Sequence, residues 1–150
     1  GVNLQASTCV ELAKHPNIVA VKEASGNLQQ IMEILRDKPA DFDVLSGDDG
    51  ITQPMMALGA KGVISVAANG YPEVFCKMVT SMLNNDVETA LELHYKMLKM
   101  NNLIFADGNP AGIKALMASR NLCKNVLRLP LVTACDNVQD DIKKELTMMM

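Results

Sequence analysis

The chain has 150 residues, of which 49% are apolar and 21% are charged, and its net charge is −3. This length and composition are typical of an ordinary globular protein of about one domain, and the small negative charge excludes a basic surface for nucleic acid or anionic lipid. No apolar run reaches the roughly 18 residues that a membrane span needs, and the opening GVNLQAS has neither the basic region nor the apolar core of a signal peptide.

Three units of similar pattern follow one another in the first part of the chain. In each unit a short apolar run ends in small residues, and an amphipathic helical pattern comes next. The runs end about 20 to 24 residues apart, which is the spacing that compact βα units need. Runs that are apolar on both faces predict a parallel sheet covered by helices. The predicted strands are residues 18–21, 42–45 and 62–66, and helices are predicted over residues 28–37, 51–60 and 71–85.

Helix start signals agree with this reading. Ser25 or Asn27 can cap the helix that begins near Leu28, and Pro72 suits the first turn of the third helix. After residue 84 the strand patterns stop. Three helical patterns follow, so we predict two parts: βα units in residues 1–84 and a helical region in residues 85–150. The three later helical patterns cover residues 86–105, 109–122 and 138–149.

Three parallel strands present a physical difficulty. They leave two open edges and cannot close a barrel, which typically takes eight βα units. Apolar open edges invite aggregation or pairing with something else. The chain also begins with glycine rather than methionine. We therefore expect the back part of a larger α/β protein, or a piece that depends on a partner.

The first predicted strand ends in a lysine, although lysine is among the side chains most costly to bury. Alternation along the strand puts Ile18, Ala20 and Lys22 on one face. Lys22 then lies at the carboxyl end of its strand, where parallel α/β folds bind ligands. A packed stem and a partly desolvated amine would favour the uncharged form that a Schiff-base nucleophile needs. The alternative is a strand-end lysine that reaches into water, and spacing alone leaves both open.

The next two strand ends supply other parts of a pocket. In SGDDG, after the second strand, Gly47 would let a ligand approach the backbone closely. In the third unit, Ile64 shares the parity of Gly62 and Val66 and would face inward. An amine, a bare backbone edge and an apolar wall could hold a small keto acid. These glycines could equally be ordinary turn residues, and the pattern does not separate the two.

Other kinds of site have weaker support. Asp48 and Asp49 are adjacent and would point to opposite sides, so we expect no shared metal ion. The sequence has no GxGxxG or P-loop spacing and no nucleophile elbow. We expect neither a metal nor a cofactor. The cysteines lie far apart, which predicts reduced thiols in a reducing, cytoplasmic compartment. They are Cys9, Cys76, Cys123 and Cys135.

Five motifs resemble one known family. VAVKEASGN, VLSGDDG, GVISVAAN, NPAGIKALM and LRLPL occur in the order and spacing of the dihydrodipicolinate synthase family. That family belongs to the pyruvate-dependent class I aldolases, in the N-acetylneuraminate lyase superfamily, built on a (β/α)8 barrel. The resemblance covers essentially the whole chain but only the second half of the family's length. It implies an α/β fold made of the last three βα units of a TIM barrel, strands six to eight, with a C-terminal helical appendage.

The resemblance also implies a reaction. Lys22 would form a Schiff base with pyruvate, and the enamine would attack L-aspartate semialdehyde to give 4-hydroxy-tetrahydrodipicolinate, on the route to diaminopimelate and lysine. Gly47 and Ile64 match positions that line the pyruvate pocket. The family's proton-relay tyrosine, pocket threonines and carboxylate-binding arginine all precede residue 1, and Tyr71 and Tyr95 lie outside the matching motifs. The isolated chain is therefore expected to be inactive or weak.

Alternatives stay open at this point. N-acetylneuraminate lyase and the keto-deoxy sugar acid aldolases share the lysine and the barrel, although KEASGN with LRLPL resembles the synthase more. A non-catalytic folding or interaction module, with a structural Lys22, is an alternative from another class. The family's helical appendage implies a homo-oligomer, a dimer or a tetramer. Leu28 and Leu58 fall on helices that resemble its weaker subunit interface, unless they pack in the ordinary way.

Overall fold

The computed structural model describes residues 2–149, which divide into two compact units. The first, the sheet unit, comprises the residues up to Ser65 together with Val79–Asp86. The second, the helical unit, comprises Val66–Met78 and the residues from Val87 onward. By packing, therefore, residues 66–78 belong with the C-terminal helices, whereas the division after residue 84 remains a prediction from the order of elements along the chain.

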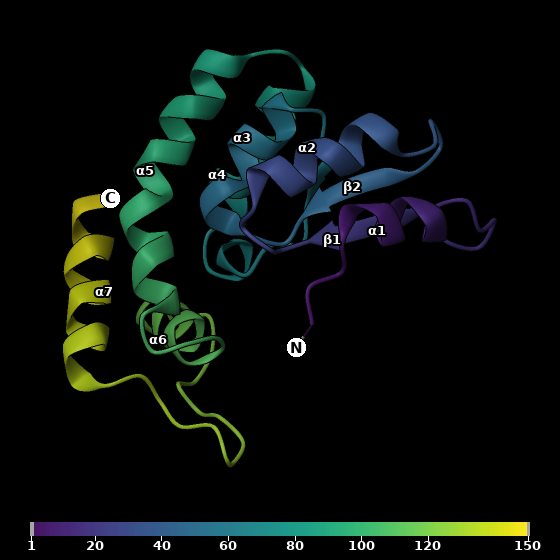
Figure 1. Ribbon diagram of the computed structural model, residues 1–150. Helices are drawn as coiled ribbons and strands as arrows, with labels where there is room; N and C mark the ends of the chain where they lie inside the picture. The colour runs from purple at the N-terminus through teal and green to yellow at the C-terminus, as the bar shows by residue number, and fades with distance from the viewer. Residues whose placement is uncertain (1, 150) are drawn as a thin grey trace. The chain divides into compact units, whose positions relative to one another are not determined.

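The sheet unit holds three parallel strands in the order β1-β2-β3, with helices between them (Figure 1). The register pairs Lys22 with Leu45 and Leu45 with Gly62, so these three residues share one face of the sheet. The strands are β1 (Ala20–Glu23), β2 (Asp43–Ser46) and β3 (Gly62–Val63), and the helices are α1 (Ala6–Leu12), α2 (Leu28–Asp37) and α3 (Thr52–Ala57), with a short 3-10 helix at Asp49–Ile51.

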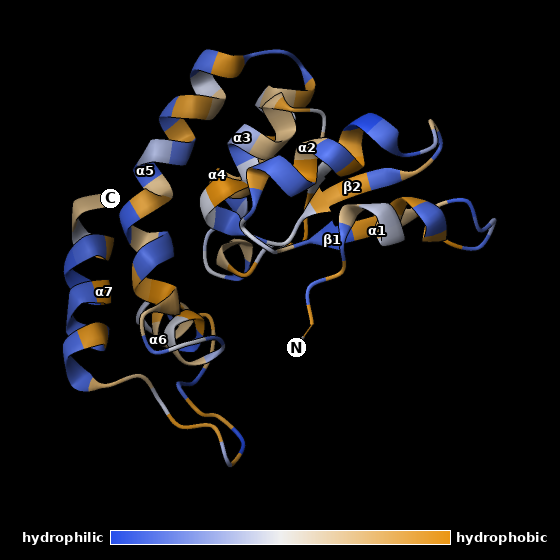
Figure 2. Ribbon diagram, viewed as in Figure 1, coloured by the Kyte–Doolittle hydropathy of each residue, from blue (hydrophilic) through white to orange (hydrophobic). Residues whose placement is uncertain are grey.

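One face of the sheet packs against the helices. Val44 is fully buried there, and Val21 packs partly buried against the same core. On α2 the apolar residues lie along one side and the polar residues along the other (Figure 2), and Ile31 and Ile34 bury the apolar side. The side chain of Asn27 caps α2 by accepting a hydrogen bond from Gln30 N at 3.2 Å, as one of the two predicted caps would.

The first strand begins later than expected, and this corrects one side-chain assignment. Ile18 was predicted to share a face with Lys22, but β1 begins only at Ala20, so strand alternation does not extend back to it. Ile18 instead packs against the core, and its neighbour Val19 is exposed. The third strand is also shorter than predicted: β3 ends at Val63, although the backbone of Ile64 still bonds β2.

The helical unit confirms the three helices predicted after residue 84. Figure 1 shows α5 and α7 side by side, and both also contact α6. No helix within residues 2–149 has the length and apolar character needed to cross a membrane. The elements are a 3-10 helix at Ala67–Asn69, the start of α4 (Pro72–Leu83), α5 (Val87–Phe105), α6 (Ala111–Ser119) and α7 (Asp136–Met149).

Gly112 allows α6 to lie directly on α5. A Cβ atom added to Gly112 would be 2.2 Å from the carbonyl oxygen of Ile104 and 2.6 Å from its carbonyl carbon. Both atoms are backbone, and Ile104 is fully buried. The two helix backbones therefore meet at a distance that only glycine permits.

Arg120, just after α6, joins segments that are distant in sequence. Its Nη1 donates to the carbonyl oxygen of Gly70, and its Nη2 donates to Glu73 Oε1 at 2.8 Å. Its guanidinium carbon lies 4.3 Å from the centroid of the Tyr71 ring, a cation–π contact. One side chain thus ties the end of α6 to the turn before α4 and to the first turn of α4.

His94 gives the helical unit a pH dependence. It is buried on α5, its Nδ1 has no hydrogen-bond partner, and burial lowers its pKa below the ordinary 6.5. The unfolded chain therefore takes up this proton more readily, and stability falls as the pH drops below about 6.5. Replacing His94 by glutamine should reduce the change in the free energy of unfolding, measured with urea, between about pH 7.5 and about pH 5.5. His15→Gln, at an exposed histidine, is the matched control, and equal slopes in both variants would contradict the prediction.

Candidate active site

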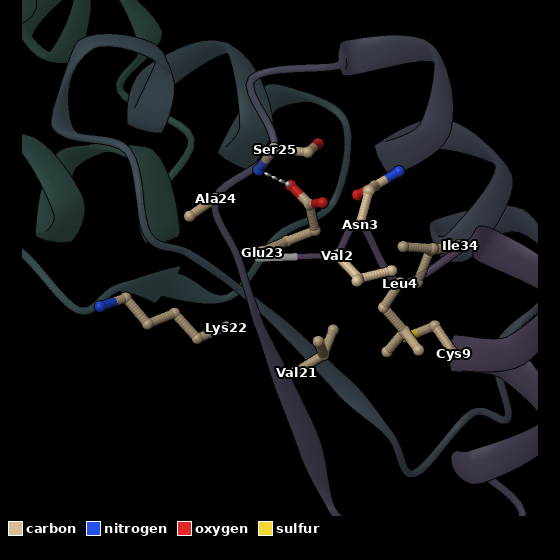
Figure 3. Close-up of a pocket in the computed structure, with 10 residues that line it drawn as sticks. All are labelled: Val2, Asn3, Leu4, Cys9, Val21, Lys22, Glu23, Ala24, Ser25 and Ile34. Carbon is tan, nitrogen blue, oxygen red and sulfur yellow. Dashed lines mark hydrogen bonds between the residues drawn. The ribbon is translucent and has the colours of Figure 1, made fainter.

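Lys22 stands near the carboxyl end of β1, on the sheet face opposite the helices. Figure 3 shows its side chain extending away from Leu4, Cys9 and Ile34, which lie on the other side of the strand. The predicted parity is therefore correct for Lys22. Of the two environments left open for this lysine, a desolvated amine or one that reaches into water, the described residues give the second, because the side chain is exposed. The same face carries Leu45, which is only partly buried, so the described residues leave this face of the sheet accessible.

Gly47 lies directly against the stem of Lys22. A Cβ atom added to Gly47 would be 2.8 Å from Lys22 Cε, 3.0 Å from Lys22 Cγ and 2.8 Å from Ala24 Cβ. The backbone of Gly47 also donates to Glu23 O at 2.7 Å, which fixes the turn to β1. The structure thus brings together the lysine and the glycine that the sequence singled out, and the missing side chain makes the space that the lysine stem occupies.

Ile64 continues the same face one step beyond β3. Its N–H donates to Ser46 O at 2.8 Å, so it stays in register with β2 although the strand proper ends at Val63. Its side chain is 49% exposed. Ile64 therefore supplies an apolar surface on the Lys22 side of the sheet, as its parity predicted.

Hydrogen bonds within the SGDD turn hold Gly47 in place. The hydroxyl of Ser46 donates to Asp48 O at 2.9 Å and accepts from Asp48 N at 3.1 Å. Thr52 Oγ1 donates to the same carbonyl at 2.9 Å, and Asp48 Oδ1 accepts from Gly50 N at 2.9 Å. Asp48 is thus a capping residue of its own turn. Within residues 2–149 no group of three or more histidine, cysteine or acidic residues could hold a metal ion.

Glu23 is the residue that the sequence reasoning missed. It is 6% exposed on the core-facing side of β1, and its carboxylate accepts from Ser25 N at 3.1 Å and from Gln30 Nε2 at 3.2 Å. Gln30 in turn accepts from Asn3 Nδ2 at 2.7 Å. The available signal was the parity of Glu23 with Val21, because a carboxylate on a buried face needs partners. These bonds fix the loop that follows Lys22.

Cys9 lies beside this network and has no nucleophilic character. It is buried under β1, and burial first, then the nearby Glu23 carboxylate, raise the pKa of its thiol. A thiol in such surroundings stays protonated. Lys22 therefore remains the nucleophile candidate on this strand, on its opposite and accessible face.

Comparison with known proteins finds one family over nearly the whole chain. A family model described as the dihydrodipicolinate synthetase family matches residues 1–149. The 4-hydroxy-tetrahydrodipicolinate synthase of Phocaeicola vulgatus is 51% identical over 133 residues, which cover 88% of this chain and 45% of that protein. That of Azobacteroides pseudotrichonymphae is 44% identical over 149 residues, 99% of this chain and 50% of that protein. The chain thus spans about half the length of the curated relatives it matches.

Solved structures extend the similarity to the fold. The dihydrodipicolinate synthase of Aquifex aeolicus has 36% identity and a TM-score of 0.91, covering 96% of this chain and 50% of that one. The Acinetobacter baumannii enzyme, solved in complex with pyruvate, has 31% identity and a TM-score of 0.93. The match covers 99% of this chain and 51% of that one. These matches confirm the predicted α/β class and the assignment to one half of the synthase fold. The chain belongs to the dihydrodipicolinate synthetase family.

Proposed function

We propose that this chain carries the Schiff-base lysine of a 4-hydroxy-tetrahydrodipicolinate synthase, a lyase of amino-acid biosynthesis. The observation that supports it best is the packing of Gly47 against the Lys22 stem at the carboxyl edge of a parallel sheet, in a chain of the synthetase family. Pyruvate is the proposed first substrate, in keeping with the pyruvate complex of the Acinetobacter baumannii relative. Gly47 and Ile64 are the proposed walls of its site.

The proposed chemistry uses the amine of Lys22 as a nucleophile. The uncharged Nζ attacks the ketone carbon of pyruvate, and loss of water leaves a protonated imine. This cation makes the methyl group acidic, so a methyl proton leaves and an enamine forms. The enamine carbon bonds to the aldehyde carbon of L-aspartate semialdehyde, which restores the imine. The amine of that substrate then attacks the imine carbon and expels Lys22, which closes the ring and frees the enzyme.

The open face around Lys22 sets a limit on what the chain does alone. Lys22 is exposed and Ile64 is 49% exposed, so the described residues form only part of a pocket wall. Orienting the substrate and transferring its protons ordinarily lower the barrier by several kcal/mol. We therefore infer that the preceding half of the synthase fold supplies the remaining wall and the proton relay, and that the chain alone turns over weakly or not at all.

Assembly and location complete the proposal. We infer a cytoplasmic enzyme because the cysteines lie far apart in the sequence, as expected of reduced thiols in a reducing compartment. A homo-oligomer, a dimer or tetramer, is supported by apolar side chains left exposed on the helices of the sheet unit, among them Met32 on α2 and Leu58 just after α3. Leu28, the other interface candidate, packs partly against the core.

Borohydride trapping tests the proposed chemistry. We expect pyruvate and sodium borohydride to give a stable adduct on Lys22 in preference to the other exposed lysines, such as Lys14 and Lys61, as located by peptide mass mapping. The reaction is run with the chain alone and with the chain mixed with a complementing polypeptide, defined as the part of the Phocaeicola vulgatus synthase that precedes the match. Adducts distributed evenly over all lysines would refute a Schiff-base role for Lys22. Cleavage of neuraminate by the mixture, without condensation, would point instead to a related aldolase.

Gly47→Ala should slow the adduct without abolishing it. The added methyl group would meet the Lys22 stem at 2.8 Å, so the amine must move. A displacement of about 1 Å can cost about 10²-fold in rate, and we expect a loss of that order in trapping by the mixture. Gly50→Ala is the control in the same turn, because its Cβ would meet only Asp48 Oδ1, at 3.3 Å. An unchanged rate in Gly47→Ala would show that the lysine stem does not depend on this glycine.

A further inference from the structure

Glu23, the residue after Lys22, is bonded through both its side chain and its main chain. Its carboxylate accepts hydrogen bonds from Ser25 N at 3.1 Å and from Gln30 Nε2 at 3.2 Å. Its carbonyl oxygen accepts from Gly47 N at 2.7 Å. The residue that follows the nucleophile candidate is therefore fixed to the start of α2 on one side and to the turn after β2 on the other.

The amide of Gln30 has one orientation available for this contact. Its Oε1 accepts from Asn3 Nδ2 at 2.7 Å, and its Nε2 donates to Leu4 O at 3.3 Å as well as to Glu23 Oε1. Gln30 and Glu23 are both buried. A buried polar network of this kind is costly to leave partly satisfied, so α2 determines where the carboxylate lies.

The position of Glu23 determines the direction of the Lys22 side chain. The two residues share one planar peptide unit, so bonds to the carbonyl and the carboxylate of Glu23 restrict the backbone rotations that aim Lys22. Figure 3 shows the carboxylate of Glu23 beside Ser25 and the Lys22 side chain extending away from it. The Lys22 stem lies against Gly47, whose amide is bonded to Glu23 O. One residue thus fixes both the lysine and the glycine that the lysine packs against.

We propose that Glu23 is a positioning residue for the Schiff-base lysine. Its bonds to Ser25 and Gln30 keep the end of β1 in the conformation that lays the Lys22 stem against Gly47. It acts through the backbone, because its side chain lies on the core face of the strand and Lys22 lies on the other face. The effect on catalysis rests on the proposed function of Lys22, whereas the effect on side-chain position does not.

Glu23→Gln tests the effect on the amine. Glutamine fills the same space, but its NH2 group would face the donor of Ser25 or of Gln30, so one bond is lost. We expect the maximal rate of borohydride trapping at Lys22, in the mixture with the complementing polypeptide, to fall at least about tenfold, while the pyruvate concentration for half-maximal trapping changes less than about twofold. Rates are expressed per folded molecule, with the folded fraction taken from urea unfolding, so that lower stability alone does not count as slower trapping.

Glu11→Gln is the matched control for this variant. Glu11 is an exposed carboxylate of the same unit, paired with the exposed Lys14, and its substitution should leave the trapping rate unchanged. A normal rate in Glu23→Gln, or an equal loss in Glu11→Gln, would overturn the proposal.

A change at Gln30 identifies the bond responsible. In Gln30→Glu the carboxylate of Glu23 loses its donor and meets a second carboxylate. Adding Glu23→Gln to this background returns a donor and an acceptor to the pair, so it should raise the trapping rate at least about threefold, opposite in sign to its effect in the parent. The bonds from Gln30 to Asn3 and Leu4 are altered alike in the two variants compared, so their loss cancels. No increase in the double variant would overturn the role of the pair.

NMR of the isotope-labelled chain measures the position of the side chain without any chemistry. In the parent we expect nuclear Overhauser contacts from the Gly47 α-hydrogens to the Cγ and Cε methylenes of Lys22, because a Cβ on Gly47 would lie 3.0 and 2.8 Å from these carbons. Glu23→Gln should weaken these contacts, and unchanged contacts would overturn the proposal. If they weaken but neither the parent nor any variant forms an adduct at Lys22, the Schiff-base chemistry is refuted and the control of side-chain position stands, so the two proposals fail separately.

Discussion

Lys22→Arg is expected to abolish pyruvate trapping at residue 22 and to lower turnover of the mixture by at least about 10³-fold. Arginine keeps the positive charge and most of the stem, but its guanidinium does not give up a proton at accessible pH and forms no imine. Removing a covalent nucleophile ordinarily costs several orders of magnitude in rate. Single-turnover trapping and steady-state condensation measure the two effects separately.

The matched control for this variant is Lys61→Arg. Lys61 is also exposed and belongs to the same unit, just before β3, so any general effect of removing an ammonium group appears there too. Both substitutions should leave the free energy of unfolding within about 0.5 kcal/mol, because surface changes ordinarily have effects of that size. Normal turnover in Lys22→Arg would exclude the lysine as the nucleophile whatever the family resemblance implies.

Gly112→Ala is expected to destabilise the chain by about 1 to 3 kcal/mol or more. In most helices the same change stabilises by about 1 kcal/mol, because glycine loses more backbone entropy on folding. Here the new methyl group would lie 2.2 Å from the Ile104 carbonyl oxygen, so α5 and α6 must separate. Urea denaturation followed by circular dichroism measures the change.

Two further variants identify the cause of that loss. Ile104→Ala in the Gly112→Ala background should not restore stability, since the clash involves the backbone of Ile104 rather than its side chain. Ser119→Ala, at the end of the same helix, removes only the hydrogen bond from its hydroxyl to Ala115 O at 2.9 Å and should cost less, about 0.5 to 1 kcal/mol. If Ile104→Ala restored the free energy of unfolding, or if Gly112→Ala raised it, the two backbones would not be in the contact described.

The helical elements were predictable to different degrees. The three C-terminal helices have long periodic patterns, and the structure has them within a few residues of the predicted bounds. α1 was not predicted, because it has only seven residues and its N-cap residue, Gln5, makes no side-chain cap. Short apolar runs also left the strand limits uncertain: β1 was predicted over residues 18–21, but Ile18 packs before the strand starts.

The site was predictable in its parity but not in its environment. Alternation placed Lys22 and Ile64 on the sheet face away from the core, and the turn after the second strand supplied Gly47. Exposure of the lysine depends on what covers that face, which a local pattern does not encode. The contacts of Glu23 with Gln30 likewise depend on how α2 sits against β1, and only the tertiary structure gives that information.

The contacts of Arg120 have a consequence for how the helical unit opens. The same guanidinium donates hydrogen bonds to the carbonyl of Gly70 and the carboxylate of Glu73 and contacts the ring of Tyr71. These residues lie on a segment about fifty positions earlier in the chain. Fraying of the α6 terminus therefore removes all three supports from that earlier segment at once. We expect the two regions to exchange their amide hydrogens as one cooperative unit, although a long helix separates them along the polypeptide.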